Sequence, residues 1–97
     1  MKKIELDLSG CKYLGEIHER IKVAFNFPEW YGANWDAFWD LLRSECDAEY
    51  LFISGIKTLS AELSEAIKPM FNVLDDLVSE REEYKDFTTP FGYKVLS

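Results

Sequence analysis

The sequence predicts a small α/β domain in which about four helices pack on a mainly parallel sheet of three strands. Three short segments, near residues 2–8, 50–54 and 91–96, carry the apolar patterns of strands. Longer segments between them repeat apolar residues at the steps of three and four that amphipathic helices require. The order is strand, helix, helix, strand, one or two helices, strand, which is typical of α/β folds in two or three layers. We expect a single domain over residues 1–97.

The N-terminal quarter of the chain is predicted to form the first strand and the first helix. From residue 2 to residue 8, apolar side chains recur at every second position, which is the period of a half-buried strand, and Ser9-Gly10 ends it. The apolar stripe of the helix that follows consists of Tyr13, Leu14, Ile17, Ile21, Ala24 and Phe25. His18, the single histidine, lies one step off this stripe, and we interpret it as a surface or helix-packing residue.

A second helix is predicted from Trp35 to Ser44 or Glu45. Pro28 separates it from the first helix, because the residue before a proline disfavours helical backbone angles. Asn34 is placed to cap the new helix with its side-chain oxygen. The expected buried stripe consists of Trp35, Phe38, Trp39, Leu42 and Cys46, with Trp39 at its border.

The second half of the chain is predicted to hold a strand, one or two helices and a final strand. Residues 50–54 form the short apolar run that is typical of a buried strand. Pro69 interrupts the helical pattern that follows, so we expect two helices over 60–67 and 69–83, or one kinked helix. From residue 91 to residue 96, Phe91, Tyr93 and Val95 alternate with Gly92, Lys94 and Leu96, which predicts the C-terminal strand.

Composition argues against several classes of function. The net charge of −7 disfavours direct binding of nucleic acid, which needs a basic surface. No apolar run is long enough to span a membrane, and acidic residues interrupt the N-terminal segment where a secretory signal needs apolar ones. The spacing of Cys11 and Cys46 fits neither a disulfide framework nor a zinc site, so we expect two free thiols in a reducing compartment. We therefore expect a cytoplasmic monomer without a metal or cofactor.

One stretch of the sequence concentrates aromatic and acidic residues. Seven of the fifteen residues from Phe25 to Trp39 are aromatic, and residues 25–50 hold six acids against one base. Asp36 and Asp40 lie one helical turn apart and therefore share a face, and Arg43 follows at a spacing that would partly neutralise Asp40. The acidity of the chain is thus focused on the second helix and the loop before it.

Three interpretations of this stretch remain open. In the first interpretation, the stretch is only a solvated helix face. In the second, Asp36 and Asp40 are the acid and base of a small hydrolase, although no histidine, phosphate loop or metal-ligand spacing accompanies them. The third interpretation is a protein-binding surface. Trp30 and Tyr31 are expected to be exposed in the loop, and exposed rings beside fixed charge are typical of binding hot spots. Such a surface would stand in for the phosphates and bases of a nucleic acid and bind a basic, phosphate-binding protein.

Residues 28–40 follow the pattern P-E-[aromatic]-Y-G-x-N-x-D-A-x-W-D, and at this stretch the sequence resembles the barstar-like family of intracellular ribonuclease inhibitors. The resemblance extends more weakly over the whole chain. It implies a three-stranded parallel sheet packed by helices. It also implies that the loop and the second helix enter the active-site cleft of a basic secreted ribonuclease or toxin nuclease domain.

The resemblance further implies roles for single residues. Trp30 takes the place of a family tyrosine that stacks on the enzyme, and Asn34 and Trp35 line the contact. Asp36 and Asp40 meet the arginines, the lysine and the catalytic histidine of the nuclease. The expected partner-binding residues are Trp30, Tyr31, Asn34, Trp35, Asp36, Trp39, Asp40, Arg43, Asp76 and Glu80.

Departures from the family pattern bear on the target. Trp35 replaces a leucine and adds bulk, Arg43 replaces an uncharged residue, and Glu45 is nearest to the position of an aromatic residue. Arg43 would repel a basic cleft or select a different one.

From the resemblance as a whole, we expect an immunity protein that blocks a ribonuclease active site by mimicking its phosphate substrate. The alternative is a binding module of the same fold whose partner is not a nuclease.

Overall fold

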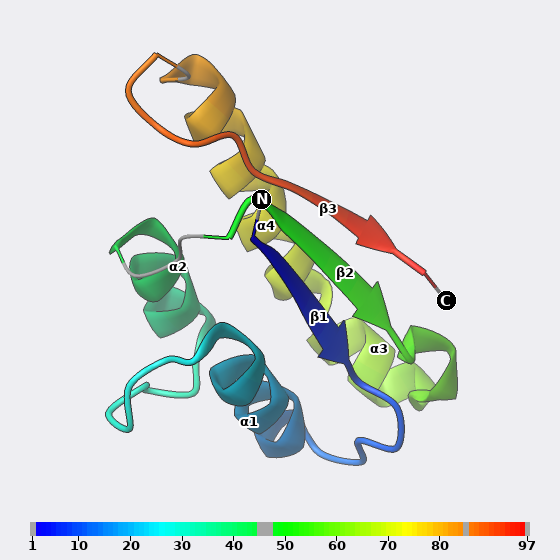
Figure 1. Cartoon of the computed structure of the whole chain (residues 1–97). Helices are drawn as coiled ribbons and strands as arrows, with labels where there is room; N and C mark the ends of the chain where they lie inside the picture. Colours follow the sequence, from blue (N-terminus) through cyan, green and yellow to red (C-terminus); the bar gives the residue numbers. More distant parts are fainter. Residues whose placement is uncertain (1, 45–47, 85, 97) are drawn as a thin grey trace.

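A computed structural model describes residues 2–44, 48–84 and 86–96 of the chain (Figure 1). Its strands and helices follow the predicted order. They are β1 (Lys3–Asp7), α1 (Leu14–Phe25), α2 (Trp35–Ser44), β2 (Tyr50–Ser54), the 3-10 helix η1 (Ile56–Thr58), α3 (Ala61–Ala66), α4 (Lys68–Glu83) and β3 (Gly92–Val95). Only η1 was not predicted, because its three residues are too few to show a helical period.

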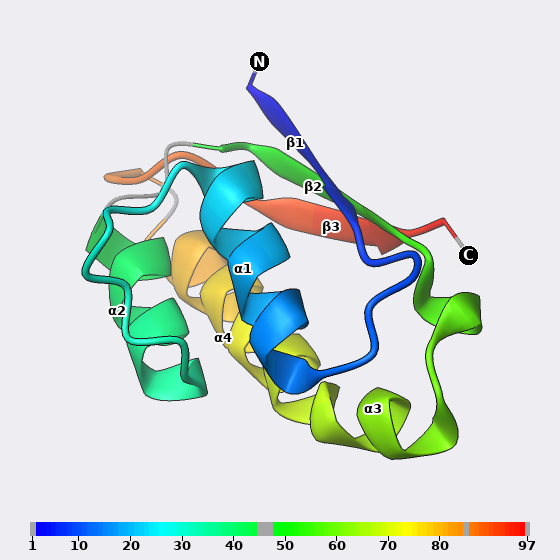
Figure 2. The same ribbon diagram turned by 90° about the horizontal axis from the view of Figure 1, so that it is seen from below.

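The three strands form one parallel sheet in the order β1-β2-β3, with β2 in the centre. Lys3 pairs with Tyr50, and Tyr50 pairs with Gly92, so these positions share one face of the sheet. Figure 2 shows α1, α2, α3 and α4 together on the other face. The predicted α/β fold with a three-stranded parallel sheet is therefore confirmed, and it has two layers.

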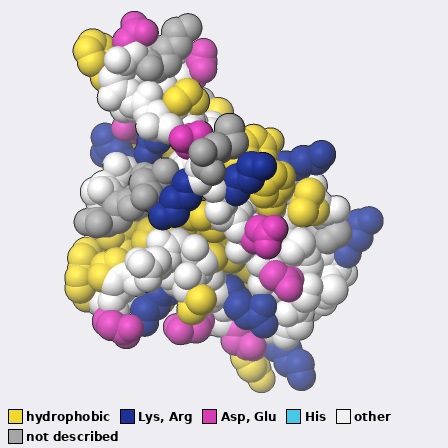
Figure 3. Space-filling model, viewed as in Figure 1, with side chains coloured by type: hydrophobic (Ala, Val, Ile, Leu, Met, Phe, Trp, Pro, Cys, Tyr) yellow, Lys and Arg dark blue, Asp and Glu magenta, His cyan; other side chains and the backbone are white. Residues whose placement is uncertain are grey.

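The face of the sheet that carries Lys3, Tyr50 and Gly92 is not covered by any helix of the described residues (Figure 2). Figure 3 looks onto this uncovered sheet face and shows basic and acidic side chains mixed on it. β1 contributes exposed Lys3, Glu5 and Asp7, and β3 contributes Lys94. Parallel sheets are usually buried on both faces, and these charged side chains allow this one to face water.

The hydrophobic core lies between the sheet and the helices. Alternate side chains of β1 and β2 enter it, together with the apolar stripes of the helices. Its largest fully buried side chains are Leu6, Leu8, Ile17, Ile21, Phe38, Leu42, Leu51, Ile53, Ile67, Met70, Leu74 and Leu77. Burial of a side chain of this size stabilises the fold by about 1.5–3 kcal/mol. Cys11 is a buried free thiol, as predicted, whereas Cys46 lies outside the described residues.

Near α1 and within α2, three side chains differ in burial from their predicted positions. Tyr13 and Leu14 were placed in the apolar stripe of α1, but both are exposed, because the helix begins only at Leu14 and Tyr13 is the extended residue before it. Leu41 is buried although it lies outside the predicted stripe of α2. The buried face of α2 is therefore wider than the predicted stripe.

The predicted break at Pro69 is confirmed. Pro69 lies in the first turn of α4, where a proline removes no helical hydrogen bond. Ser60 caps α3, since its hydroxyl oxygen accepts a hydrogen bond from the backbone N–H of Leu63 at 3.1 Å. α4 then extends for 16 residues and packs against α2. Within the described ranges, no helix combines the length and apolar character needed to cross a bilayer.

Candidate functional site

Residues 26–34 are here called the binding loop, after the partner contacts predicted for Trp30, Tyr31 and Asn34. The loop leaves α1 in a conformation set by local bonds. Asn26 adopts a left-handed backbone with φ of 56°, which turns the chain away from the helix axis. The N–H of Phe27 donates to the carbonyl of Lys22 at 2.9 Å. The amino group of Lys22 also pairs with the carboxylate of Glu29 at 2.9 Å. The start of the loop is therefore tied to the last turn of α1.

Asn34 caps α2 at the other end of the loop, as predicted. Its Oδ1 accepts a hydrogen bond from the N–H of Ala37 at 2.8 Å, and its Nδ2 donates to the carbonyl of Gly32 at 3.1 Å. A Cβ at Gly32 would lie 3.2 Å from Nδ2 of Asn34, so a larger residue here would require the Asn34 side chain to shift slightly. The left-handed backbone angle falls on Ala33, with φ of 51°. Contact of Asn34 with a partner stays a prediction.

The two neighbouring rings of the binding loop differ in burial. Trp30 is 71% exposed, as predicted, whereas Tyr31 is only 8% exposed. The Tyr31 ring packs on Phe27 with ring centroids 5.3 Å apart, and its hydroxyl lies 2.7 Å from Nδ1 of His18. The prediction of an exposed Tyr31 is therefore wrong. The loop directs this ring into the core, where the histidine satisfies its hydroxyl.

His18 connects the binding loop to α2. The residue is 3% exposed, which confirms the helix-packing interpretation and excludes the surface one. Its ring centroid lies 4.4 Å from that of Trp35, which in turn packs 5.8 Å from Phe38. Burial lowers the pKa of His18 and raises the pKa of Tyr31, so both groups are neutral near pH 7. Trp35 is half-buried and serves the core as well as the surface.

The outward face of α2 carries two exposed carboxylates, Asp36 and Asp40. They lie one turn apart, as predicted. In the part of the chain that the structure describes, neither carboxylate has a hydrogen-bond or ion-pair partner. Asp36 lies in the first turn, where the helix dipole favours a negative charge. Two unpaired carboxylates on a rigid helix are available to the cations of a partner.

Arg43 makes a different ion pair from the predicted one. The spacing in the sequence predicts that it neutralises Asp40, but its Nε donates to Oε1 of Glu80 on α4 at 3.1 Å. Its guanidinium carbon lies 5.2 Å from the centre of the Trp39 ring. The packing of α2 on α4 brings Glu80 within reach, and the ring of Trp39 supports the cation. Asp40 is therefore left without an ion-pair partner among the described residues.

A groove of about 570 Å³ lies between α2 and α4. It is lined by Trp39, Arg43, Asp76, Ser79, Glu80, Glu83 and Tyr84. The structure thus brings together four predicted site residues from two helices that are far apart in the sequence. Ser79, Glu83 and Tyr84 were not predicted. The signal for Ser79 and Glu83 was present, because they lie three and seven residues after Asp76 and so share its helix face.

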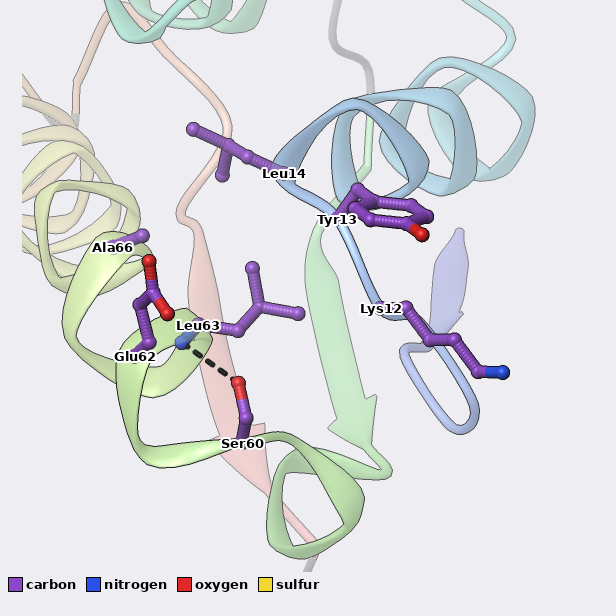
Figure 4. A pocket seen from close by; sticks show the side chains of 7 residues that line it. All are labelled: Lys12, Tyr13, Leu14, Ser60, Glu62, Leu63 and Ala66. Carbon is purple, nitrogen blue, oxygen red and sulfur yellow. Dashed lines mark hydrogen bonds between the residues drawn. The ribbon is translucent and has the colours of Figure 1, made fainter.

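A second hollow, of about 350 Å³, lies between the start of α1 and α3 (Figure 4). Its lining consists of Lys12, Tyr13, Leu14, Ser60, Glu62, Leu63 and Ala66. The hydroxyl of Ser60 is engaged in the helix cap, and the amino group of Lys12 points away from Glu62 (Figure 4). Among the described residues, no three side chains of His, Cys, Asp or Glu converge as metal ligands. This hollow therefore brings no acid–base pair or ligand set together.

Two comparisons with known proteins bear on the surface formed by the binding loop, α2 and α4. The protein family described as Barstar (barnase inhibitor) matches the chain over residues 1–92. A relative from Bacillus subtilis (strain 168), named "Putative ribonuclease inhibitor YrdF", is 30% identical over 88 residues, which cover 89% of this chain and 92% of the relative. The family match includes every element of the candidate surface.

Proposed function

The chain belongs to the Barstar (barnase inhibitor) family, and from that premise we propose that it inhibits a ribonuclease by covering its active site with the binding loop and the outward face of α2. The resemblance found at residues 28–40 is thereby confirmed. Inhibitors of this family are not enzymes, which agrees with the expectation for this chain. The proposed partner is a basic secreted ribonuclease or toxin nuclease domain, and the binding site is part of the same proposal.

The observation that carries the proposal is the pair of free carboxylates on α2. Asp36 and Asp40 are exposed, one turn apart and without a partner in the described residues. The core fixes the helix beneath them through Phe38 and Leu42, and Asn34 fixes its N-terminus. Two carboxylates at such a spacing can occupy the positions of substrate phosphates among the cations of a nuclease. Little ordering is needed on binding, which favours affinity.

Aromatic rings extend this surface on both sides. Trp30 is exposed in the binding loop, where its ring can stack on the enzyme as a nucleic-acid base would. Trp39 lies at the border of the core and faces the groove, next to the acids Asp76 and Glu80. Tyr31 supports the loop from the inside through His18 and does not offer its ring to a partner.

The proposal also includes a place of action. An inhibitor of a secreted nuclease protects the cell that makes the enzyme, so we place this protein in the cytoplasm, as a monomer that binds one enzyme molecule. The net charge of −7 suits a basic partner, since opposite net charges accelerate association.

An inhibition titration tests the proposal. Barnase and a panel of other small secreted microbial ribonucleases are each mixed with increasing amounts of the purified protein, and cleavage of a fluorogenic RNA substrate is followed. We expect the activity of at least one enzyme to fall to zero at a one-to-one ratio. Association should slow as salt is raised, because salt screens the attraction between opposite charges.

Full activity of every enzyme at a tenfold excess of the protein would contradict the proposal. In that case the alternative, a module of the same fold with a partner that is not a nuclease, would be favoured. Cleavage of RNA by the purified protein alone would instead revive the hydrolase interpretation of Asp36 and Asp40.

A further inference from the structure

Arg43 is a base held in the middle of an acidic groove. Among the seven residues that line the groove, three are acids and Arg43 is the one base. Its Nε donates to Glu80 at 3.1 Å, and its guanidinium carbon lies 5.2 Å from the centre of the Trp39 ring. An ion pair on one side and an aromatic face on the other restrict the plane of the guanidinium group.

The outer edge of this guanidinium group is free. An arginine carries five N–H donors in a fixed plane, and the contact with Glu80 uses only the one at Nε. Within the described ranges, Nη1 and Nη2 have no hydrogen-bond partner, and the side chain is 51% exposed. Two parallel donors at such an edge match the two oxygens of a carboxylate or a phosphate.

The charge around Arg43 decides between these two anions. Asp76 and Glu83 line the same groove, and Asp40 lies one turn before Arg43 on α2. These acids repel a polyanion such as RNA, and the chain as a whole carries a charge of −7. A single carboxylate on an otherwise basic protein escapes this repulsion, because the surrounding bases of that protein face the neighbouring acids.

We propose that Arg43 binds a carboxylate of the target ribonuclease and thereby selects which ribonucleases this chain inhibits. The inference rests on the proposed function and names the partner group for one residue of its surface. A ribonuclease with an acid opposite Arg43 gains a two-point contact. A ribonuclease with a base or an apolar group there meets either repulsion or a desolvated, unpaired cation. Discrimination by attraction and repulsion at one position is a common basis of interface specificity.

The experiment uses whichever ribonuclease of the panel the native protein inhibits most tightly. Inhibition constants are measured for the native protein and for Arg43→Ala, Arg43→Glu and Arg43→Lys. Lys57→Glu is the matched control, because it makes the same change of charge on an exposed residue of η1, outside the candidate surface. Melting temperatures of all variants show whether the fold is retained, and an exposed pair such as Arg43–Glu80 contributes little to stability.

The sign of the effect distinguishes the proposal from general electrostatics. Removing a positive charge from an inhibitor of a basic enzyme should strengthen binding if only net charge matters. We expect the opposite: at least about 10-fold weaker inhibition for Arg43→Ala and at least about 100-fold for Arg43→Glu, as for loss of a close interfacial charge pair. Arg43→Lys should recover only part, because an ammonium group lacks the two-point geometry. Lys57→Glu should inhibit as well as the native protein or better.

A scan of the enzyme identifies the partner group. Each Asp and Glu at the rim of the ribonuclease active site is changed in turn to Asn or Gln, and inhibition by the native protein and by Arg43→Ala is compared. One enzyme variant should bind the native protein at least about 10-fold less well and bind Arg43→Ala no less well than the unchanged enzyme does. That coupling would assign the carboxylate.

Three results would overturn the inference. The first is Arg43→Ala inhibiting as tightly as the native protein or more tightly, which leaves the proposed function standing. The second is Arg43-dependent binding of a single-stranded RNA oligonucleotide by the protein alone, measured by fluorescence anisotropy, which would assign a phosphate instead. The third is a native protein that inhibits no ribonuclease of the panel, which removes the proposed function and this inference together.

Discussion

The uncovered sheet face and the outward face of α2 both carry charged side chains, but they arrange them differently. On the sheet, Glu5 and Lys94 occupy the same row on either side of Phe52, so opposite charges alternate across the strands. On α2, Asp36 and Asp40 have the same sign and stand without a partner in the described residues. The charges of the sheet face largely cancel at a distance, whereas those of α2 add.

Under the proposed function, this difference separates a surface that only faces water from one that binds a partner. Two like charges at a spacing of four residues destabilise an isolated helix by about 0.2–0.5 kcal/mol. The fold retains this cost at Asp36 and Asp40 even though Arg43, on the same helix, is close enough in sequence to relieve it. Arg43 instead pairs with Glu80. A basic partner that supplied cations would relieve the repulsion on α2, which links the arrangement to the proposed function.

The largest expected effect is a loss of affinity for the ribonuclease when a carboxylate is removed from α2, compared with the removal of a carboxylate from the sheet face. Asp40→Ala should weaken binding to the inhibited ribonuclease by at least about 2 kcal/mol, the threshold that defines an interface hot spot. Glu5→Ala removes the same charge from the sheet face and should leave the affinity within about twofold of the native value, because a distant exposed charge contributes little. Inhibition constants for both variants measure the difference.

Thermal unfolding of the same two variants shows whether the loss belongs to binding. Both residues are exposed, so both variants should melt close to the native protein, since surface substitutions usually change stability by no more than about 0.5 kcal/mol. If Asp40→Ala lost stability in proportion to its affinity, the carboxylate would have a structural role and the contrast between the two faces would disappear.

A smaller effect is expected inside the binding loop. Tyr31→Phe removes the hydroxyl that satisfies Nδ1 of His18, and a buried polar atom left without a partner costs about 1–3 kcal/mol of stability. Tyr50→Phe is the matched change on the sheet face, where the half-buried ring packs on Phe52. Urea unfolding should show the loss for Tyr31→Phe and a change within about 0.5 kcal/mol for Tyr50→Phe. Equal stability of the two variants would mean that the hydroxyl of Tyr31 does not hold the loop.

The parts of the molecule that were predictable from the sequence depend on local chemistry. The order of strands and helices follows from apolar periodicity, and Asn34 and Pro69 act as predicted because capping and proline geometry involve only neighbouring residues. The exposure of Trp30 and of the two aspartates of α2 also agrees with the pattern. The family resemblance at residues 28–40 added the partner class, which periodicity alone does not contain.

Two of the predictions that were wrong concern contacts between distant segments. Tyr31 turns inward because His18, thirteen residues earlier, offers its hydroxyl a buried partner. Arg43 turns to Glu80, which lies thirty-seven residues later, because α2 packs on α4. Both residues have a plausible local environment in the sequence, an aromatic loop and a nearby aspartate. Tertiary packing brought His18 to Tyr31 and Glu80 to Arg43. The apolar periodicity of a sequence does not indicate which helices pack against each other.

The same buried histidine predicts a pH dependence of stability. Burial lowers the pKa of His18 below its ordinary value of 6.5, so the unfolded chain binds a proton more readily than the folded one. The contribution of neutral His18 to the free energy of unfolding is therefore complete above about pH 6.5, and it declines as the pH falls toward the folded-state pKa. Urea midpoints between pH 5 and pH 8 should show this decline in the native protein and a weaker one in His18→Gln. An unchanged slope in His18→Gln would place the titrating group elsewhere.

The smallest expected effect concerns the rate at which the two proteins meet. The like charges of α2 produce a field that attracts a basic partner from a distance, whereas the mixed charges of the sheet face do not. Asp36→Asn should therefore slow association with the ribonuclease by about two- to threefold at low salt. Glu5→Gln should leave the rate unchanged. At 1 M salt, where the screening length falls to about 3 Å, the two variants should associate at the same rate as the native protein. Stopped-flow measurements across this range of salt check the prediction. Equal slowing by Asp36→Asn and Glu5→Gln would show that steering depends on net charge alone and not on how the charges of α2 are arranged.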